Sequence, residues 1–383
     1  MRKAHLCFVP LLVASVLVGC RSAPEAKDYD APLPPGAPAL RRITDPNEIP
    51  DFREAFRNTD GLREAAENSL NFLSKPSSYG RFPDGPISHA DVVAGLQELI
   101  KMLDANLPPS LMNAYMRERF DVYMSVGWNG KGTVLFTGYY TPIFEASPVE
   151  TPVFRYPLYK APPDLEKLPD GDPAVPMPDR RTIEEQGLYE GNELVWLSDP
   201  FEAYVTHVQG SARLRMPDGE EITIGYDANN GHEYRSVRQA MLDDGIVGSH
   251  AGLQSMIDYF NAHPDRVQQY TWINPRYIFF RVVPEGTPRG TINEPVIPMR
   301  TIATDKSIFP PAALTFIKAD LPQFRNGNVV IAPYTGFTLD QDAGGAIRAP
   351  GRCDLYMGTG DDAGRLAGRA QHEGRLYYLV LKD

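Results

Sequence analysis

Two aspartates lie twelve residues apart near the C-terminus, in surroundings that suit carboxyl chemistry. Asp342 precedes Gly344 and Gly345, which let a bulky ligand approach the backbone closely. Asp354 is flanked by a cysteine, a leucine and a tyrosine, which would partly withdraw it from water. Withdrawal from water raises the pKa of a carboxyl group, and a protonated aspartic acid near neutral pH can act as a general acid. Aspartates near glycines are also typical turn residues, so both interpretations stay open on spacing alone.

Other kinds of catalytic chemistry find little support in the sequence. Cys353 adjoins Asp354, but thiol catalysis needs a positioned base and no motif supplies one, so we interpret Cys353 as a small packing residue. The seven histidines form no His-Glu-x-x-His pair or comparable metal set. No phosphate-cradling glycine loop or Gly-x-Ser-x-Gly turn occurs. We therefore expect no metal and no cofactor.

The overall composition indicates a folded chain large enough for two domains. It has 383 residues, of which 42% are hydrophobic and 23% are charged. The formal net charge of −11 argues against the basic face that nucleic acids require, so no nucleic-acid partner is expected. The 36 prolines and 32 glycines predict many turns and short strands.

The N-terminus has the pattern of a targeting segment. A positively charged start leads into an apolar run too short for a comfortable transmembrane helix, and the run ends in Leu17-Val18-Gly19-Cys20, which resembles a bacterial lipoprotein cleavage box. We predict a signal peptide over residues 1–19, lipidation of Cys20 and a proline-rich tether over residues 20–45. Arg21, by analogy with enterobacterial sorting, predicts an outer-membrane lipoprotein that faces the periplasm. The alternative is an ordinary signal peptide or an uncleaved anchor.

The elements that must position the two aspartates can be predicted from periodicity. Amphipathic helices are expected within residues 51–73, from residue 88 to 103 and after residue 108. Residues 133–140 and 276–283 have the β-branched and aromatic content of strands. The pattern of the last hundred residues predicts short strands separated by glycine and proline, which is typical of a small barrel. These strands are expected at residues 295–302, 313–317, 328–333 and 376–381.

Six stretches resemble, in the same order, the membrane-bound lytic murein transglycosylase A family. They are residues 136–142, 208–214, 231–236, 274–280, 303–307 and 342–360. The resemblance covers the chain from about residue 121 to the C-terminus. It implies a fold that is mainly β with flanking helices (α+β), in which a double-psi β-barrel carries a second, inserted β-rich domain with a groove between them.

The same resemblance divides the folded part of the chain into three regions. Residues 46–140 would form helices and the first part of the barrel domain. Residues 141–285 would form the inserted substrate-binding domain. Residues 286–383 would form the C-terminal part of the barrel, with the catalytic aspartate.

The resemblance also implies an activity, that of a peptidoglycan lytic exotransglycosylase. Such an enzyme is a carbon–oxygen lyase that cleaves the β-1,4 bond between N-acetylmuramic acid and N-acetylglucosamine and leaves a 1,6-anhydro sugar. Asp354 matches the single acid, which protonates the leaving oxygen and then takes the proton of the C6 hydroxyl. Supporting and substrate-binding positions fall on Asp342, Asp305, Thr137, Tyr139, Gln209, Gly344 and Gly345.

The expected partners follow from the same resemblance. They are peptidoglycan glycan strands, the outer membrane through lipidated Cys20, and proteins of wall synthesis. Two alternative functions stay open. One is a hydrolytic muramidase that uses two of the aspartates and water. The other is a non-catalytic peptidoglycan-binding lipoprotein on the same barrel.

Overall fold

The computed structural model describes residues 27–382 apart from 167, 169–172, 249–251 and 285. The predicted signal peptide over residues 1–19 and the predicted lipidation site, Cys20, lie outside the described residues. Within the described part, no helix has the length and apolar character needed to cross a membrane.

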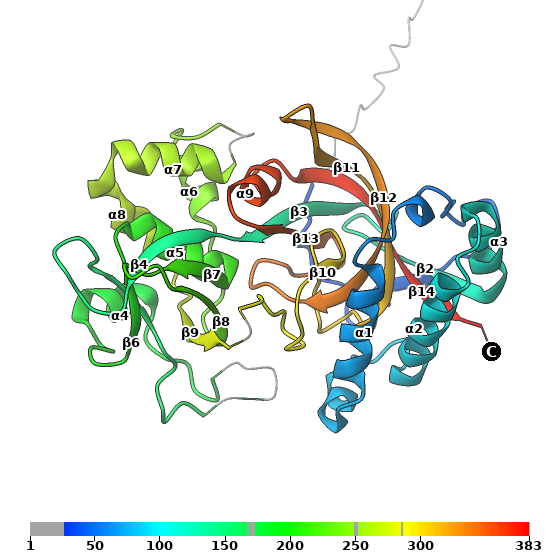
Figure 1. Cartoon of the computed structure of the whole chain (residues 1–383), viewed down its shortest axis with the longest axis horizontal. Helices are drawn as coiled ribbons and strands as arrows, with labels where there is room; N and C mark the ends of the chain where they lie inside the picture. Colours follow the sequence, from blue (N-terminus) through cyan, green and yellow to red (C-terminus); the bar gives the residue numbers. More distant parts are fainter. Residues whose placement is uncertain (1–26, 167, 169–172, 249–251, 285, 383) are drawn as a thin grey trace, which may run out of the picture.

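A closed six-stranded barrel forms the centre of the molecule (Figure 1). In hydrogen-bonding order its strands are β14, β11, β12, β10, β13 and β3, and β3 pairs with β14 to complete the ring. β10 runs parallel to β12, and β13 runs parallel to β3, whereas the other barrel pairs are antiparallel. The bounds are β3 Val134–Thr141, β10 Thr301–Ala303, β11 Leu314–Arg325, β12 Asn328–Asp342, β13 Arg352–Thr359 and β14 Gln371–Leu381.

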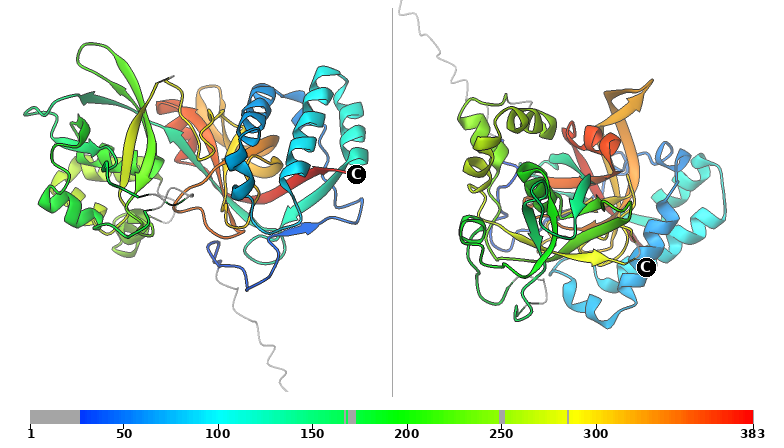
Figure 2. Two further views of the ribbon diagram at one scale, coloured as in Figure 1. Left: turned by 90° about the horizontal axis from the view of Figure 1, so that it is seen from below. Right: turned by 60° about the vertical axis from the view of Figure 1, so that its left-hand side comes forward.

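Helices cover one side of the barrel, and the inserted domain lies on the opposite side (Figures 1 and 2). Strands β1 (Leu40–Arg42) and β2 (Phe120–Ser125) extend the sheet beyond β14. The three predicted helices are confirmed as α1 (Leu62–Leu73), α2 (His89–Asp104) and α3 (Pro109–Arg119). The predicted capping box begins α2, because Ser88 and Asp91 each accept a hydrogen bond from the other's backbone N–H. Short 3₁₀ helices occur at Ala55–Arg57, Pro76–Arg81 and Pro264–Arg266.

The inserted domain is built on a second six-stranded sheet, with the strand order β5-β6-β4-β7-β8-β9. The chain enters it where β3 runs through Pro142 into β4, and it returns to the barrel after β9. Its strands are β4 Ile143–Ser147, β5 Tyr156–Tyr159, β6 Glu193–Leu197, β7 Ser211–Arg215, β8 Glu221–Asn229 and β9 Ile278–Val283. Its helices are α4 Arg180–Gln186, α5 Pro200–Gln209, α6 Val237–Asp243, α7 Leu253–Ala262 and α8 Val267–Thr271. Helix α9 (Asp361–Ala367) packs back on β13 and β3 of the barrel.

This architecture confirms the predicted fold class: mainly β with flanking helices, and a barrel that carries an inserted β-rich domain. Two details of the sequence interpretation are wrong. The tether predicted over residues 20–45 extends too far into the folded chain. Leu40–Arg42 pair with β2, and Ala39, Leu40 and Ile43 are buried in the core. The strand predicted at residues 295–302 shrinks to β10, since Pro295 and Pro298 lack the N–H groups that a ladder requires.

The turn interpretation of Asp354 is also wrong. Asp354 is the third residue of β13, and its neighbours Cys353 and Leu355 are fully buried in the barrel core. Asp342 is the last residue of β12. The two carboxylates are therefore carried by strands, and the glycine-rich segment between them is the connection from β12 to β13.

An aromatic cluster joins the segment that leads into the N-terminal helices to the barrel. The ring of Phe52, which is fully buried, lies 4.8 Å from that of Phe316 on β11 and 5.7 Å from that of Phe337 on β12. Such ring pairs stabilise beyond their buried area.

Replacing Phe52 by alanine should therefore destabilise the fold by about 3–5 kcal/mol, because it removes a large buried side chain and leaves a cavity. Chemical unfolding followed by circular dichroism measures the effect. Leu111→Ala is a suitable control, because that leucine is 54% exposed and its truncation should cost less than about 0.5 kcal/mol. Equal destabilisation by both variants would contradict the assignment of Phe52 to the core.

Candidate active site

Strand register places Asp354 in a row of residues that come from distant parts of the chain. Asp354 lies opposite Thr137 on β3 and opposite Ala303 on β10. Ala303 in turn pairs with Asp342 on β12, next to a register shift. Because neighbouring strands lie about 4.8 Å apart, Thr137 is adjacent to Asp354 and Asp342 is two strands away.

Strand alternation determines which side chains share the face of Asp354. Cys353 and Leu355 point into the hydrophobic core, so Asp354 and Arg352 point to the other face of β13. This outcome confirms the interpretation of Cys353 as a packing residue, and burial raises the pKa of its thiol well above the usual range.

Asp354 is half-buried, and the Oδ1 atom of its carboxyl group is shielded from water. Burial raises the pKa of Asp354 to about 7, and the Asp342 carboxylate also raises it, whereas the Arg352 guanidinium and the Thr137 hydroxyl oppose the shift. Asp354 Oδ1 and Thr137 Oγ1 are both buried, and among the described residues neither has a partner in full hydrogen-bond geometry, although the Thr137 hydroxyl lies close enough to the carboxyl group to lower its pKa. Buried polar atoms are normally paired, so these two atoms mark a place where a ligand can supply the missing contacts.

Asp342 is held firmly at the end of β12. Its Oδ1 accepts hydrogen bonds from the backbone N–H groups of Thr291 (2.9 Å) and Ala343 (2.8 Å), and its Oδ2 accepts one from the Tyr139 hydroxyl (2.7 Å). Burial raises the pKa of Asp342, and these hydrogen bonds oppose that rise. The ring of Tyr139 also lies 5.2 Å from that of Tyr356 on β13. Tyr139, Asp342 and Asp354 thus belong to one cluster.

Asp305 is placed differently from the other two aspartates. It is buried, and its Oδ1 accepts hydrogen bonds from the backbone and the hydroxyl of Ser307 (3.0 and 2.6 Å). Its Oδ2 accepts one from the backbone N–H of Ala349 (2.9 Å). Ala349 has a φ of +65°, an unfavourable conformation for a residue with a side chain, so Asp305 fixes the loop between Asp342 and Asp354.

The glycines and Gln209 lie where the two domains meet. A Cβ on Gly345 would be 3.1 Å from Nε of Arg276, a residue of the inserted domain, so the absence of a side chain permits this approach. Gly344 accepts a turn hydrogen bond from the Ile347 backbone (3.0 Å). The side chain of Gln209, at the end of α5, accepts a hydrogen bond from the backbone N–H of Tyr140 (3.1 Å). Gln209 therefore ties the inserted domain to β3 just beyond Thr137.

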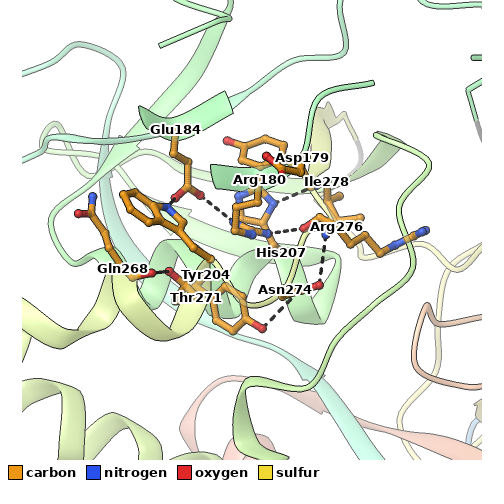
Figure 3. Close-up of polar contacts among 12 residues, drawn as sticks. Asp179, Arg180, Glu184, Tyr204, His207, Gln268, Thr271, Asn274, Arg276 and Ile278 are labelled. Atoms are coloured by element: carbon orange, nitrogen blue, oxygen red, sulfur yellow. Dashed lines mark hydrogen bonds and ion pairs between the residues drawn. The ribbon is translucent and has the colours of Figure 1, made fainter. Parts of the chain in front are cut away.

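A buried polar network holds the backbone of Arg276 in place (Figure 3). Arg180 Nη2 donates to the Arg276 carbonyl (2.8 Å), and Asn274 Oδ1 accepts from the Arg276 N–H (3.2 Å). Arg180 is only 1% exposed and lies about 5 Å from the rings of Tyr204 and Tyr277. Arg276 Nη1 donates to the His232 carbonyl (2.9 Å). The network fixes the Arg276 backbone at the boundary with the barrel.

Three groups near the aspartates were not identified from the sequence. Arg352 and Tyr356 lie two residues on either side of Asp354, and Asp340 lies two residues before Asp342. Asp340 is fully buried and pairs with Lys306, Thr304 (2.7 Å) and Tyr378 (2.7 Å). The period of two along a strand would have singled out Arg352 and Tyr356 had β13 been predicted as a strand, and Asp340 had the strand predicted at residues 328–333 been extended to residue 342.

The two halves of this arrangement match two known domains. Residues 135–281 match the family model of the MltA specific insert domain, and residues 300–380 match that of the 3D domain. This chain belongs to the membrane-bound lytic murein transglycosylase A family. The family resemblance found in the sequence is thereby confirmed.

Relatives in this family match most of the chain. Membrane-bound lytic murein transglycosylase A of Escherichia coli (strain K12) is 29% identical over 263 residues, covering 68% of this chain and 69% of that protein. The Vibrio cholerae protein of the same name is 29% identical over 263 residues, with coverages of 67% and 68%.

Two solved structures are similar over almost the whole described chain. The membrane-bound lytic murein transglycosylase from Agrobacterium tumefaciens is 27% identical, with a TM-score of 0.75, and covers 90% of this chain and 98% of its own. E. coli MltA with bound chitohexaose is 25% identical, with a TM-score of 0.68 and coverages of 94% and 100%.

The raised pKa of Asp354 has a consequence for stability. Between the ordinary value near 3.8 and about 7, the folded state retains a proton that the unfolded chain has lost. The contribution of this group to folding stability is therefore complete below pH 4 and is lost as the pH rises toward and past 7.

Asp354→Asn should accordingly unfold at a higher temperature than the parent at pH 8, with little difference at pH 4. Thermal unfolding at the two pH values measures this difference. Asp320→Asn, at an exposed position on β11, makes the same chemical change outside the site and should show no such pH dependence. A gain for Asp354→Asn that is equal at both pH values would contradict the raised pKa.

Proposed function

We propose that this chain cleaves the glycan strands of peptidoglycan as a lytic transglycosylase, with Asp354 acting first as general acid and then as general base. One observation carries the assignment of Asp354. It is the carboxyl group of the cluster whose pKa burial raises to about 7, and its Oδ1 is buried without a partner among the described residues. A general acid is most effective when its pKa lies near the working pH.

In the first step, protonated Asp354 donates its proton to the glycosidic oxygen. The bond between that oxygen and C1 of N-acetylmuramic acid breaks, and N-acetylglucosamine leaves with the proton. Positive charge develops at C1 and on the ring oxygen as the bond breaks. Asp354 is now a carboxylate close to this charge.

In the second step, the Asp354 carboxylate takes the proton of the C6 hydroxyl of the same muramic sugar. The C6 oxygen attacks C1 and closes the 1,6-anhydro ring. Asp354 is protonated again and no water is consumed. Because the nucleophile is part of the bound substrate, its effective concentration is high and a second catalytic carboxylate is unnecessary.

The surrounding residues have supporting roles in this proposal. Asp342, held by Tyr139 and two backbone N–H groups, places a negative charge near Asp354 that favours the protonated acid and later the cationic sugar. Thr137 offers a buried hydroxyl to the substrate beside Asp354. Asp305 shapes the loop that carries Gly344 and Gly345 through its hydrogen bonds to Ser307 and Ala349.

A lipid anchor completes the proposed arrangement. Lipidation of Cys20 would hold the enzyme at the outer membrane on its periplasmic side, within reach of the wall. Two features support an anchor of this kind: the cleavage-box sequence that ends at Cys20, and relatives that are named as membrane-bound. Partners among wall-synthesis proteins stay a prediction from the family resemblance.

The products of purified peptidoglycan provide the test. The chain from Arg21 onward should release muropeptides with 1,6-anhydro ends, which mass spectrometry distinguishes from reducing ends by the mass of one water. Asp354→Asn should lower the rate by about 10²-fold or more, because proton transfer by a positioned group contributes about 10²–10⁴-fold. Release by the parent should decline as the pH rises through 7, where Asp354 loses its proton.

Asp320→Asn is the matched control and should keep full activity. Reducing ends from the parent would instead identify a muramidase that uses water. Absence of release by the parent, with wall binding retained, would leave a peptidoglycan-binding lipoprotein. Full activity of Asp354→Asn would remove Asp354 from the mechanism.

A further inference from the structure

The first described residues pack against the strand that carries Asp354. A Cβ on Gly351, just before β13, would be 2.5 Å from the carbonyl oxygen of Tyr29, so the two backbones touch. The Tyr29 hydroxyl donates to Glu373 on β14 (2.9 Å), and Lys27 forms an ion pair with the same carboxylate (3.1 Å). The ring of Tyr29 meets that of Trp128 edge-on at 5.8 Å. Residues 27–30, which we name the N-terminal segment, therefore occupy a defined position against the barrel.

Within this segment, Asp30 reaches the face of Asp354. Its Oδ1 accepts a hydrogen bond at 3.0 Å from Nη1 of Arg352. Arg352 lies two residues before Asp354 on the same face of β13, and its side chain is only 16% exposed. Its Nε is buried without a partner among the described residues. Asp30 thus supplies the negative charge that balances a guanidinium next to the candidate acid.

Charged and titratable groups face Asp354 from several elements, and most of them are fixed by the barrel or by the inserted domain. Arg352 on β13, Tyr139 on β3 and Asp342 on β12 act on Asp354 itself. Around them, Tyr356 on β13 and Lys306 after β10 act on Asp342, and Tyr234 of the inserted domain acts on Arg352. Lys306 is already paired with Asp340 inside the barrel. Arg352 differs from the rest, because its counter-charge comes from the N-terminal segment.

We propose that the N-terminal segment is a positioning element of the active site, in which Asp30 holds Arg352 in place and offsets its charge beside Asp354. The inference rests on the proposed role of Asp354 as the acid. When the segment is docked, the acid keeps its proton at a higher pH. When the segment leaves, the unopposed guanidinium favours the carboxylate and weakens the acid. This segment follows the predicted lipid anchor in the chain. Its docking would therefore link the anchored end of the protein to the protonation of Asp354.

Replacing Asp30 and replacing Arg352 should shift the pKa of Asp354 in opposite directions, and this difference provides the test. Asp30→Asn should move the high-pH limb of the pH–rate profile to lower pH, whereas Arg352→Gln should move it to higher pH. Because the pair is partly exposed, shifts on the order of a few tenths of a pH unit are expected, smaller at high salt. In the Arg352→Gln background, Asp30→Asn should have no further effect. The profiles are measured on the full chain in detergent.

A direct titration separates this inference from the proposed function. Asp354 is followed by carbon-13 NMR of its side-chain carboxyl, with the signal assigned by its loss in Asp354→Asn. Glu48→Gln is the control, because it removes one acid from an exposed ion pair with Arg41 elsewhere in the N-terminal region.

The outcomes of the titration and the activity assay are distinct. Opposite shifts of the Asp354 titration in Asp30→Asn and Arg352→Gln, with no shift in Glu48→Gln, would support the inference. Shifts in the same direction, or none, would overturn it and leave the proposed mechanism standing. Full activity of Asp354→Asn would overturn the mechanism, while the titration would still report whether Asp30 controls the charge at this site.

Discussion

The pairing of β3 with β13 and β14 is the contact on which the site depends. β3 comes from the N-terminal half of the chain, whereas its neighbours lie near the C-terminus. Its insertion closes the barrel, sets Thr137 opposite Asp354 and brings Tyr139 to Asp342. The same strand continues through Pro142 into the inserted domain. One strand therefore completes the core, assembles the carboxyl cluster and carries the second domain.

Burial of the carboxyl cluster is costly and chemically useful. An ionised carboxylate is strongly disfavoured away from water, so Asp354 retains its proton to a pH of about 7. Asp342 experiences the same burial, but it accepts three hydrogen bonds that oppose the rise in its pKa. Two aspartates of identical type thus acquire different environments. Such a difference between neighbouring carboxyl groups is what separates an acid from an electrostatic partner.

The inserted domain is joined to the barrel by specific polar contacts as well as by the chain. Gln209 bonds to the backbone of β3, and Arg276 lies against Gly345 with its own backbone held by Arg180 and Asn274. These contacts converge on the loop that follows Asp342 and on the strand that contains Thr137. The position of the second domain is therefore coupled to the geometry of the carboxyl cluster.

Sequence patterns alone determined much of the local structure. The capping box at Ser88 and the apolar periodicity after it predicted α2, and the β-branched run at residues 133–140 predicted β3. These signals are local, because helix caps and strand alternation depend on residues a few positions apart. The family resemblance added the fold class and the identity of the aspartates.

Only the tertiary structure decided how those aspartates differ. Asp305, Asp342 and Asp354 have the same side chain, and no local pattern shows that Asp305 is occupied by loop contacts while Asp354 Oδ1 is left without a partner among the described residues. The tether prediction failed for the same reason, since β1 pairs with a strand some eighty residues away. Burial and partnership are set by strand neighbours distant in sequence, and these become defined only when the barrel closes.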